Sequence, residues 1–509
     1  MKSPVSLPVA LALVGASLFP RVVAGQPAPA EPIPLVEIYG TLVSFLEYGH
    51  TTGATAPGTY VPTGTMGAAT AMNGPNQVAA GAYTGINQSA RGVLDPGISN
   101  IGFRGGVELM PNLSVTWQVE SAIPVDGTGP ANTWASRNSN IGVTGDWGTL
   151  FFGSWDTPYT WTTRTLVNPI KSGNLTDYNS IINNPGFGVS SVTTQSTRAN
   201  TSADAAFERR QGNSVQYWTP TIAGVSARFG YSVNEGRTAA PAPAPSPSPI
   251  VASGAVSYEN GPITLREGAE IHYDYFGMSF QGGSMAASAT NRSSTDWGAK
   301  TVAQFLNKAP GFDTRVIGVA EYLSYKNKDN AAPNAVNPAL NANVEHARWS
   351  FYGLIDQTLF GKHHIWVGGG KALEGTCAKI GGAACSTTGL SAIDTVVGYI
   401  YRASKSTDFF AAAYRISNDF AASYTSSPPL GAPPAPGASI EAFGVGIVYT
   451  FSAKIVGPPT RPAPPPGPVP AATPNPAPTN EPGPVPPPNA AEPPPNPGTP
   501  PPPTPEPHS

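Results

Sequence analysis

The chain has 509 residues, of which only 12% are charged, and it contains 56 glycines and 58 prolines. Its formal net charge of −3 argues against nucleic-acid binding, which requires a concentrated basic surface. After the extreme N-terminus, no stretch approaches the ~20 apolar residues that a transmembrane helix needs, so such a helix is excluded. The abundance of Gly, Ser, Thr, Asn and aromatic residues instead favours a β-barrel with a polar lumen.

The N-terminus has the pattern of a secretory signal peptide. Lys2 supplies a positive start, an apolar run covers Val5–Phe19, and Val22–Ala24 is a plausible cleavage site. We therefore assign residues 1–24 to a signal peptide and residues 25–34 to an N-terminal linker; a short buried helix is the alternative for the apolar run. No cysteine stands directly after this run, where a lipoprotein would carry its lipid, so a lipoprotein anchor is excluded.

The signal for strands is an alternation of apolar and polar residues. It is clearest in Leu113–Glu120, Arg348–Asp356 and Phe443–Phe451. In a membrane barrel the apolar face contacts lipid and the polar face lines water, whereas in a soluble sandwich the apolar face forms a core. We expect five aromatic residues to belong to the interfacial girdles of a barrel: Tyr39, Trp117, Trp349, Tyr449 and Phe451.

The lengths of the connections predict the number of strands. Seven short links alternate with eight longer segments, which requires sixteen strands, with the short turns on the periplasmic side. The short links lie near 110–112, 146–147, 219–221, 260–262, 309–311, 360–362 and 405–407, and the longer segments near 49–96, 123–134, 155–208, 234–250, 276–295, 328–342, 374–390 and 419–438. Alternation is poor over 262–290, so eighteen strands remain an alternative. Because lipid offers no partner for an open sheet edge, the first strand, Val36–Tyr48, is expected to pair with the last, Ser439–Phe451.

The two cysteines, Cys377 and Cys385, lie in a stretch rich in Gly, Ala, Ser and Thr. In an exported protein such a pair is expected to form one disulfide inside a loop, stabilising it by ~2–3 kcal/mol. The alternative, a metal site, would need His or carboxylate partners, and the segment between the cysteines contains none.

The composition changes abruptly after Phe451, the expected terminal residue of the barrel. Pro, Ala, Gly, Asn and Thr dominate from Gly457 to Ser509, and such a segment cannot bury a core. We therefore assign residues 35–452 to the barrel and residues 453–509 to a disordered Pro-rich tail. An even number of strands leaves both barrel ends on the periplasmic side, so we expect the tail there, either in contact with peptidoglycan or inert.

Several segments, in this order, resemble the general porins of Gram-negative bacteria, especially the trimeric betaproteobacterial type. These segments are Ile38–Gly40, Ser99–Gly105, Gln118–Ser121, Gly145–Thr149, Arg210–Tyr217 and Ser404–Asp408. The resemblance covers residues 35–451 and implies an all-β fold, a sixteen-stranded antiparallel transmembrane β-barrel that is usually a homotrimer in the outer membrane. It also implies that the third loop, here 155–208, folds into the barrel, where its acidic residues face basic residues of the wall.

Selectivity in a channel requires fixed charge at the place where water is scarce. The candidates for this constriction are the basic residues Arg104, Arg137, Arg209 and Arg210 and the acidic residues Asp156, Asp177 and Asp204. The alternation of apolar and polar residues places Arg104 on the polar face, but it does not decide which face Arg137 is on. The alternative for each candidate is an ordinary loop or lumen charge. Asn100 and Ser154 stand where the family commonly has Arg, so the resemblance does not support strong anion selectivity.

No grouping of residues indicates catalysis, a metal or another cofactor. His363–His364 are adjacent rather than spaced as metal ligands, and Gly368–Lys371 lacks the spacing and the helix of a phosphate loop. The main hypothesis is a passive, water-filled channel in the outer membrane for small hydrophilic solutes and ions, not an enzyme.

Two alternatives remain open. The first is an eighteen-stranded channel specific for sugars or organic acids, which a row of aromatic residues in the lumen would favour; the sequence shows no clear row. The second is a structural or adhesive envelope protein whose tail contacts peptidoglycan.

Overall fold

The computed structural model describes residues 35–455, apart from 61, 63–71, 74–77, 80–82, 128–133, 171–174, 176–177, 184–206, 234–247, 276–290, 330–342, 380–384 and 426–433. The expected signal peptide and linker lie outside the described residues, as does the Pro-rich tail from residue 456 onward. The chain divides into two compact units, Met1–Gly457 and Pro458–Ser509, and every described residue belongs to the first.

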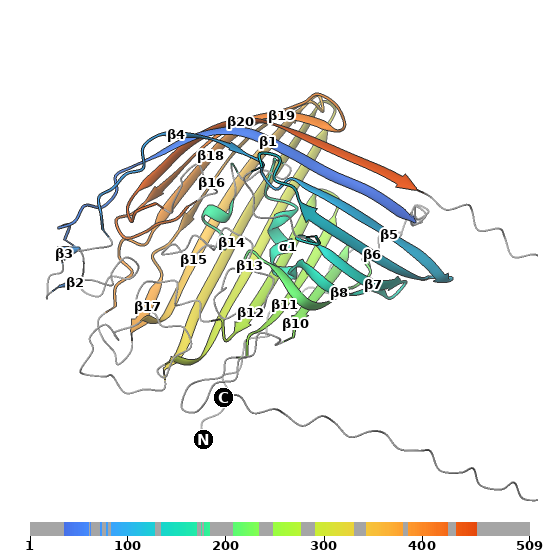
Figure 1. Ribbon diagram of the computed structural model, residues 1–509, viewed down its shortest axis with the longest axis horizontal. Coiled ribbons are helices and arrows are strands. Elements are labelled where there is room, and N and C mark those ends of the chain that lie inside the picture. The colour runs from blue at the N-terminus through green and yellow to red at the C-terminus, as the bar shows by residue number, and fades with distance from the viewer. Residues whose placement is uncertain are drawn as a thin grey trace, which may run out of the picture. The chain divides into compact units, whose positions relative to one another are not determined.

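The wall strands form one closed antiparallel sheet (Figure 1). The first strand pairs with the last, β1 with β20, so the sheet has no open edge. β4 and β5 both pair with β1, and β16 and β17 both pair with β15, so each of these pairs is one interrupted wall strand. With each pair counted once, the 18 strands of the sheet make sixteen wall strands, which confirms the predicted barrel. Closure pairs the backbone groups that lipid cannot satisfy.

The secondary structure is almost entirely strand, with one short helix and one 3₁₀ turn in the described residues. The elements are β1 (Val36–Thr52), β2 (Met72–Asn73), β3 (Val78–Ala79), β4 (Arg91–Asp95), β5 (Asn100–Met110), β6 (Leu113–Ala122), β7 (Ser139–Gly145), β8 (Gly148–Asp156), α1 (Pro158–Arg164), η1 (Tyr178–Ser180), β9 (Arg210–Trp218), β10 (Val225–Ser232), β11 (Ile250–Asn260), β12 (Ile263–Tyr273), β13 (Asn291–Ala309), β14 (Phe312–Asp329), β15 (Asn343–Leu359), β16 (His363–Ala372), β17 (Thr376–Lys379), β18 (Ala392–Arg402), β19 (Thr407–Asn418) and β20 (Ser439–Ile455). β2 and β3 pair only with each other, outside the wall. In the part of the chain that is described, no helix is long and apolar enough to cross a membrane.

Short turns and long connections alternate around the wall as predicted. The short turns join β5 to β6, β7 to β8, β9 to β10, β11 to β12, β13 to β14, β15 to β16 and β18 to β19. In the described part of the doubtful region 262–290 there is a single wall strand, β12, and it pairs directly with β13. The alternative of eighteen wall strands is therefore wrong.

The outer face of the wall is apolar. On β18, Ile393 and Val397 are about half exposed, whereas the alternating Asp394, Val396 and Ile400 are buried toward the interior. The three predicted alternations place their apolar residues on this outer face, including Trp117, Trp349, Tyr449 and Phe451 of the proposed girdles. Such an apolar band is the surface that a transmembrane barrel presents to lipid.

Tyr39 is an exception among the residues assigned to the girdles. Its side chain points into the barrel, where its hydroxyl donates to Glu120 Oε2 at 3.0 Å. The guanidinium of Arg104 lies 4.7 Å from the centre of its ring. The prediction for Tyr39 was wrong because its place in the alternation of β1, on the face shared with Glu37, decides its direction.

The expectation that only polar residues line the interior is also wrong for part of the wall. Inward residues of β1, β14, β15, β16, β18, β19 and β20 include Val43, Phe45, Ile317, Val319, Leu354, Trp366, Val396, Ile400, Phe410, Ile416, Ile440 and Val448, all nearly inaccessible to solvent. They belong to one buried cluster with Leu166, Val167, Ile170, Leu175, Ile181 and Ile182 of the third long loop. The reason is that this loop lies inside the barrel and replaces water as the neighbour of these strands.

The last strand runs past the expected barrel end. β20 ends at Ile455, four residues after Phe451, and the pairing Val36↔Ile455 keeps it in register with the start of β1. Phe451 therefore lies within the strand rather than at its end.

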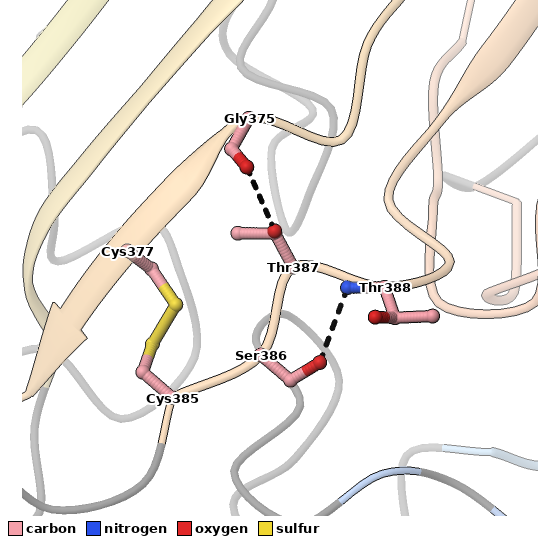
Figure 2. The surroundings of a disulfide bond; sticks show 6 residues. All are labelled: Gly375, Cys377, Cys385, Ser386, Thr387 and Thr388. Carbon is pink, nitrogen blue, oxygen red and sulfur yellow. Dashed lines mark hydrogen bonds between the residues drawn. A yellow bond between two sulfur atoms is a disulfide. The ribbon is translucent and has the colours of Figure 1, made fainter.

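Cys377 and Cys385 are joined in a disulfide with a Cα–Cα distance of 6.0 Å (Figure 2). The bridge connects β17 to the segment before β18, and both cysteines pack against a buried cluster that includes Tyr159 and Leu390. Figure 2 also shows Thr387 Oγ1 donating to the carbonyl of Gly375 at 2.9 Å. Gly375 has a φ of +78°, and a Cβ there would lie 2.1 Å from the carbonyl oxygen of Ala347, so only glycine fits this turn.

Candidate functional site

The interior of the barrel is organised by the third long loop, which joins β8 to β9 and is called loop 3 below. It begins with α1, whose N-cap Thr157 accepts a hydrogen bond from the amide of Thr160 and which has Pro158 at its start. The helix contacts β10, β11, β12 and β13 from inside the barrel (Figure 1). Inward folding of loop 3, which the family resemblance implied, is thus seen in its described residues.

Four consecutive wall strands each contribute one basic residue that holds loop 3. Arg266 on β12 donates to Thr165 Oγ1 at 2.6 Å, and Lys300 on β13 donates to Thr163 Oγ1 at 3.0 Å. The other two, Arg315 on β14 and Arg348 on β15, donate to the carbonyls of Leu166 (2.9 Å) and Ile181 (3.1 Å). Hydrogen bonds from charged donors are stronger than neutral ones, so these residues position the loop.

Glu321 on β14 is the main acidic anchor of loop 3. It accepts hydrogen bonds from the Tyr159 hydroxyl at 2.6 Å and from the Asn183 amide at 2.7 Å. Ser350 on β15 donates to the same carboxylate at 3.2 Å, and Glu321 is fully buried. Burial and the neighbouring Glu321 carboxylate raise the pKa of Tyr159 well above its ordinary value, so Tyr159 stays a neutral donor.

The rest of the inner wall carries ion pairs. On β1 and β5, Glu37 binds Arg104 with an Nε–Oε2 distance of 2.8 Å, and Ser452 donates to the same carboxylate at 2.6 Å. On β6, Glu120 binds Arg137 and accepts the hydrogen bond from Tyr39. Half of the Arg104 side chain is exposed, so it is the most accessible charge of this group.

A second charged group lies where β8, β9 and α1 meet. Asp156 binds Arg164 of α1 at 2.5 Å and Arg210 of β9 at 3.3 Å. Arg164 also binds Glu208 at 3.2 Å, and Asn138 accepts a hydrogen bond from Arg210. Burial alone would lower the pKa of Arg164, but Asp156 and Glu208 raise it above its ordinary value, so Arg164 remains charged.

The structure brings together only some of the predicted constriction residues. Arg104, Arg137, Arg210 and Asp156 lie on the inner side of the wall between β1 and β9, whereas Asp177 and Asp204 fall outside the described residues. Asp156 does not face the basic wall from the loop, because it is the last residue of β8 and the cross-strand partner of Arg210.

Arg209 and its neighbour Arg210 are both fully buried, but they have different neighbours. The guanidinium of Arg209 stacks on Tyr275, 4.7 Å from the ring centre. It therefore contributes to packing beside β12 rather than to an accessible charged surface.

Several residues of this site were missed by sequence reasoning. Glu37 and Glu120 alternate with apolar neighbours on β1 and β6, so their inward direction was predictable from parity. The partners of Arg164 and Glu208 were not predictable, because both residues lie in loop 3 and meet only when it folds into the barrel.

The inner face of β8–β12 also carries a cluster of aromatic residues and arginines that the sequence did not reveal. Arg228 of β10 lies 3.8 Å from the ring centre of Trp161 and 4.0 Å from that of Trp218. Arg266 lies 4.0 Å from the Trp161 ring, and Trp155 packs edge-on against Trp218 with ring centres 5.7 Å apart. Cation–π contacts of this kind hold the guanidinium groups in fixed planes.

The closed sheet, the apolar outer face and the inward loop define a transmembrane β-barrel of the channel-forming type. The model of the Gram-negative porin family matches residues 10–422 of the chain. The chain therefore belongs to the Gram-negative porin family, and it is an outer-membrane protein.

Individual proteins of known sequence or structure are only distantly similar to this chain. A segment of 78 residues is 36% identical to the major outer membrane protein P.IB of Neisseria gonorrhoeae, covering 15% of this chain and 22% of that protein. The anion-selective porin from Comamonas acidovorans superimposes with a TM-score of 0.54 at 16% identity over 82% of this chain and 99% of that one. An outer-membrane expressed OmpT of Vibrio cholerae aligns over 82% of this chain and 97% of that one, at 11% identity and a TM-score of 0.46. The Comamonas match supports the fold alone.

Proposed function

We propose that the protein is a passive diffusion channel for small hydrophilic solutes and ions. The observation that carries the proposal is the division of the inner wall: one part is covered by loop 3, and the part between β1 and β9 presents charged and polar groups. A solute passes between these two surfaces down its concentration gradient. No reaction is catalysed and no cofactor takes part.

The charges of the described inner wall indicate weak ion selectivity. Four basic residues meet four acidic ones in the two charged groups, Arg104, Arg137, Arg164 and Arg210 against Glu37, Glu120, Asp156 and Glu208. Paired charges of opposite sign produce a weaker field for a passing ion than an uncompensated ring does. We place the constriction at these two groups, opposite loop 3.

The test is reconstitution of the purified protein in a planar bilayer. We expect discrete ohmic conductance steps in KCl and a reversal potential close to zero in a salt gradient. A protein that inserts as a heat-modifiable β-rich species but never conducts would overturn the proposal and favour the structural or adhesive alternative.

We also propose that the barrel assembles as a homotrimer through its outer face near the long-loop ends of β1, β19 and β20. There Glu441 lies 3.4 Å from Arg415 and 3.8 Å from His50, beside an outward hollow of about 670 Å³. Charged groups on an outer barrel face are unfavourable against lipid, and a second copy of the chain would cover them. Arg415→Glu should shift the detergent-extracted protein from trimer to monomer on native gels. An unchanged trimer would exclude this face.

For the chain ends we propose a cleaved signal peptide over residues 1–24 and a periplasmic tail from the end of β20 onward. The tail composition suits a semi-rigid spacer that reaches the cell wall. Deletion of Gly457–Ser509 should leave folding and conductance intact and reduce co-sedimentation with peptidoglycan. Loss of barrel assembly on deletion would show that the tail belongs to the barrel instead.

A further inference from the structure

A hollow of about 290 Å³ lies on the inner side of the wall where β7–β10 approach their short turns. Side-chain hydroxyls line much of it, among them those of Thr144, Thr149 and Ser226. Trp218 adds an apolar ring, and Arg228 adds a guanidinium. The hollow is therefore polar, with one flat apolar patch and one cation.

The orientation of the Arg228 guanidinium is fixed by aromatic stacking. Its central carbon lies 3.8 Å from the ring centre of Trp161 and 4.0 Å from that of Trp218. Stacking occupies the faces of the planar group, whereas its N–H donors point outward in its plane. Arg228 is thus prepared to bind a planar acceptor along its edge.

In the part of the chain that the structure describes, no acidic side chain forms a close ion pair with Arg228, and Glu259 interacts with it only at longer range. Its neighbour Arg266 takes the nearby carboxylate of Glu259 at 3.0 Å and also donates to Thr165 and to the Trp161 carbonyl. Within the described residues, Arg228 forms no ion pair within 4.0 Å and no side-chain hydrogen bond. The hollow therefore carries a local excess of positive charge, unlike the compensated groups between β1 and β9.

We propose that this hollow is a binding subsite for small hydroxylated carboxylates, such as sugar acids. A carboxylate is planar and accepts two parallel N–H bonds from one guanidinium edge, which matches the fixed plane of Arg228. The hydroxyls of Thr144 and Thr149 bond to each other at 2.8 Å and can still accept from a solute, and the hydroxyl of Ser226 can donate and accept, so the three suit the hydroxyl groups of the solute. The proposal rests on the channel function, because the subsite lies on the inner wall near one mouth of the barrel.

The subsite is expected to bind weakly and to exchange quickly. A channel conducts a solute only if the solute can leave its binding site, so tight capture would block transport. Occupancy should then reduce the ion current in a saturable manner, because a bound solute shares the lumen with the ions.

The experiment measures gluconate binding and conductance on the full-length, detergent-purified protein and on two variants, Arg228→Gln and Arg228→Lys. Isothermal titration with sodium gluconate should give saturable binding to the wild type and about tenfold weaker binding to Arg228→Gln, since a charge-assisted bidentate contact is lost. Arg228→Lys keeps the charge without the planar fork and should lie between them. Lys362→Gln, which removes an exposed cation from the turn between β15 and β16 and does not touch the hollow, is the matched control and should bind like the wild type.

Glucose, which lacks the carboxylate, and acetate, which lacks the hydroxyls, should both bind more weakly than gluconate. Equal gluconate affinity in the wild type and Arg228→Gln would overturn the proposal, and so would the absence of any binding to the wild type. Heat-modifiable gel mobility verifies that each variant is folded. If Arg228→Gln does not fold, the comparison of Arg228→Lys with the wild type tests the subsite instead. Conductance in KCl without gluconate is measured separately: its absence contradicts the channel function, whereas normal conductance without gluconate binding contradicts only the subsite.

Discussion

The inward side chains of the barrel wall have different neighbours in two parts of the wall. From β12 through β20 the inward side chains are buried against loop 3, with apolar contacts between Ile181 or Leu175 and the wall and hydrogen bonds from a basic residue on each of β12–β15. Between β1 and β9 the inward side chains include several ion pairs, and Arg104 remains half exposed.

The difference shows that inward-facing basic residues in one barrel can have different roles. Arg266, Lys300, Arg315 and Arg348 position a loop, and each donates at least one hydrogen bond to a loop atom. Arg104 is half exposed and Arg228 lines the hollow, so these are the residues that we propose a solute can contact. The neighbour that a side chain meets, rather than its direction alone, decides which role it has.

The largest effect is expected from removing the acidic anchor of loop 3. Glu321→Ala leaves the Tyr159 hydroxyl and the Asn183 amide without their buried acceptor, which costs about 3–5 kcal/mol of stability. Because the loop loses one of its two attachments to β14, single-channel conductance should also rise. Glu345→Ala is the control, since Glu345 forms an exposed pair with Lys326 and should change neither quantity. Wild-type conductance and wild-type denaturation in Glu321→Ala would contradict the anchoring role.

The next effect tests the apolar contact between wall and loop. Ile400→Ala should lower the free energy of unfolding by about 2–5 kcal/mol, because Ile400 is buried in the cluster that contains loop 3. Ile393→Ala on the same strand is the matched control; it faces outward and is half exposed, so its cost should be smaller. Urea titration followed by tryptophan fluorescence measures both. Equal costs would mean that the inner cluster is no better packed than the outer surface.

A smaller and more local effect is expected at the disulfide. Replacing both Cys377 and Cys385 with Ser removes a bridge over a sequence separation of 8, worth about 2–3 kcal/mol to that loop. Trypsin cleavage after Lys379, which lies between the cysteines, should become faster while conductance stays unchanged. Unaltered cleavage kinetics would show that the segment is held by contacts other than the bridge.

The smallest effect concerns selectivity in the charged part of the wall. Arg104→Gln leaves Glu37 uncompensated and should move the reversal potential toward cation preference, and Glu37→Gln should move it the opposite way. The shift should be clear at 0.01 M salt, where the Debye length is ~30 Å, and vanish at 1 M, where it is ~3 Å. The double variant should return to the wild-type potential.

Arg209→Gln is the contrast to Arg104→Gln. Because Arg209 is buried against Tyr275, its replacement should reduce stability without moving the reversal potential. A shift as large as that of Arg104→Gln would place Arg209 at the accessible surface and contradict its buried position.

The sequence by itself determined the class of fold, the number of wall strands and the pairing of the first strand with the last. These follow from local rules: apolar and polar residues alternate along each strand, short and long connections alternate around the barrel, and lipid leaves no open edge. The same rules placed Trp117, Trp349 and Phe443 on the outer face and Arg104 on the inner one.

Only the tertiary structure decided which inward residues meet water and which meet protein. Alternation marks Val396 and Phe410 as inward on apolar strands but cannot show that loop 3 covers them, because their contacts with the loop are more than 200 residues distant in sequence. It cannot show that Asp156 pairs with Arg210 beside it, or that Arg228 stacks on Trp161 from the loop. Parity along a strand is a local property, whereas the partner of an inward side chain is set by how a distant segment packs inside the closed barrel.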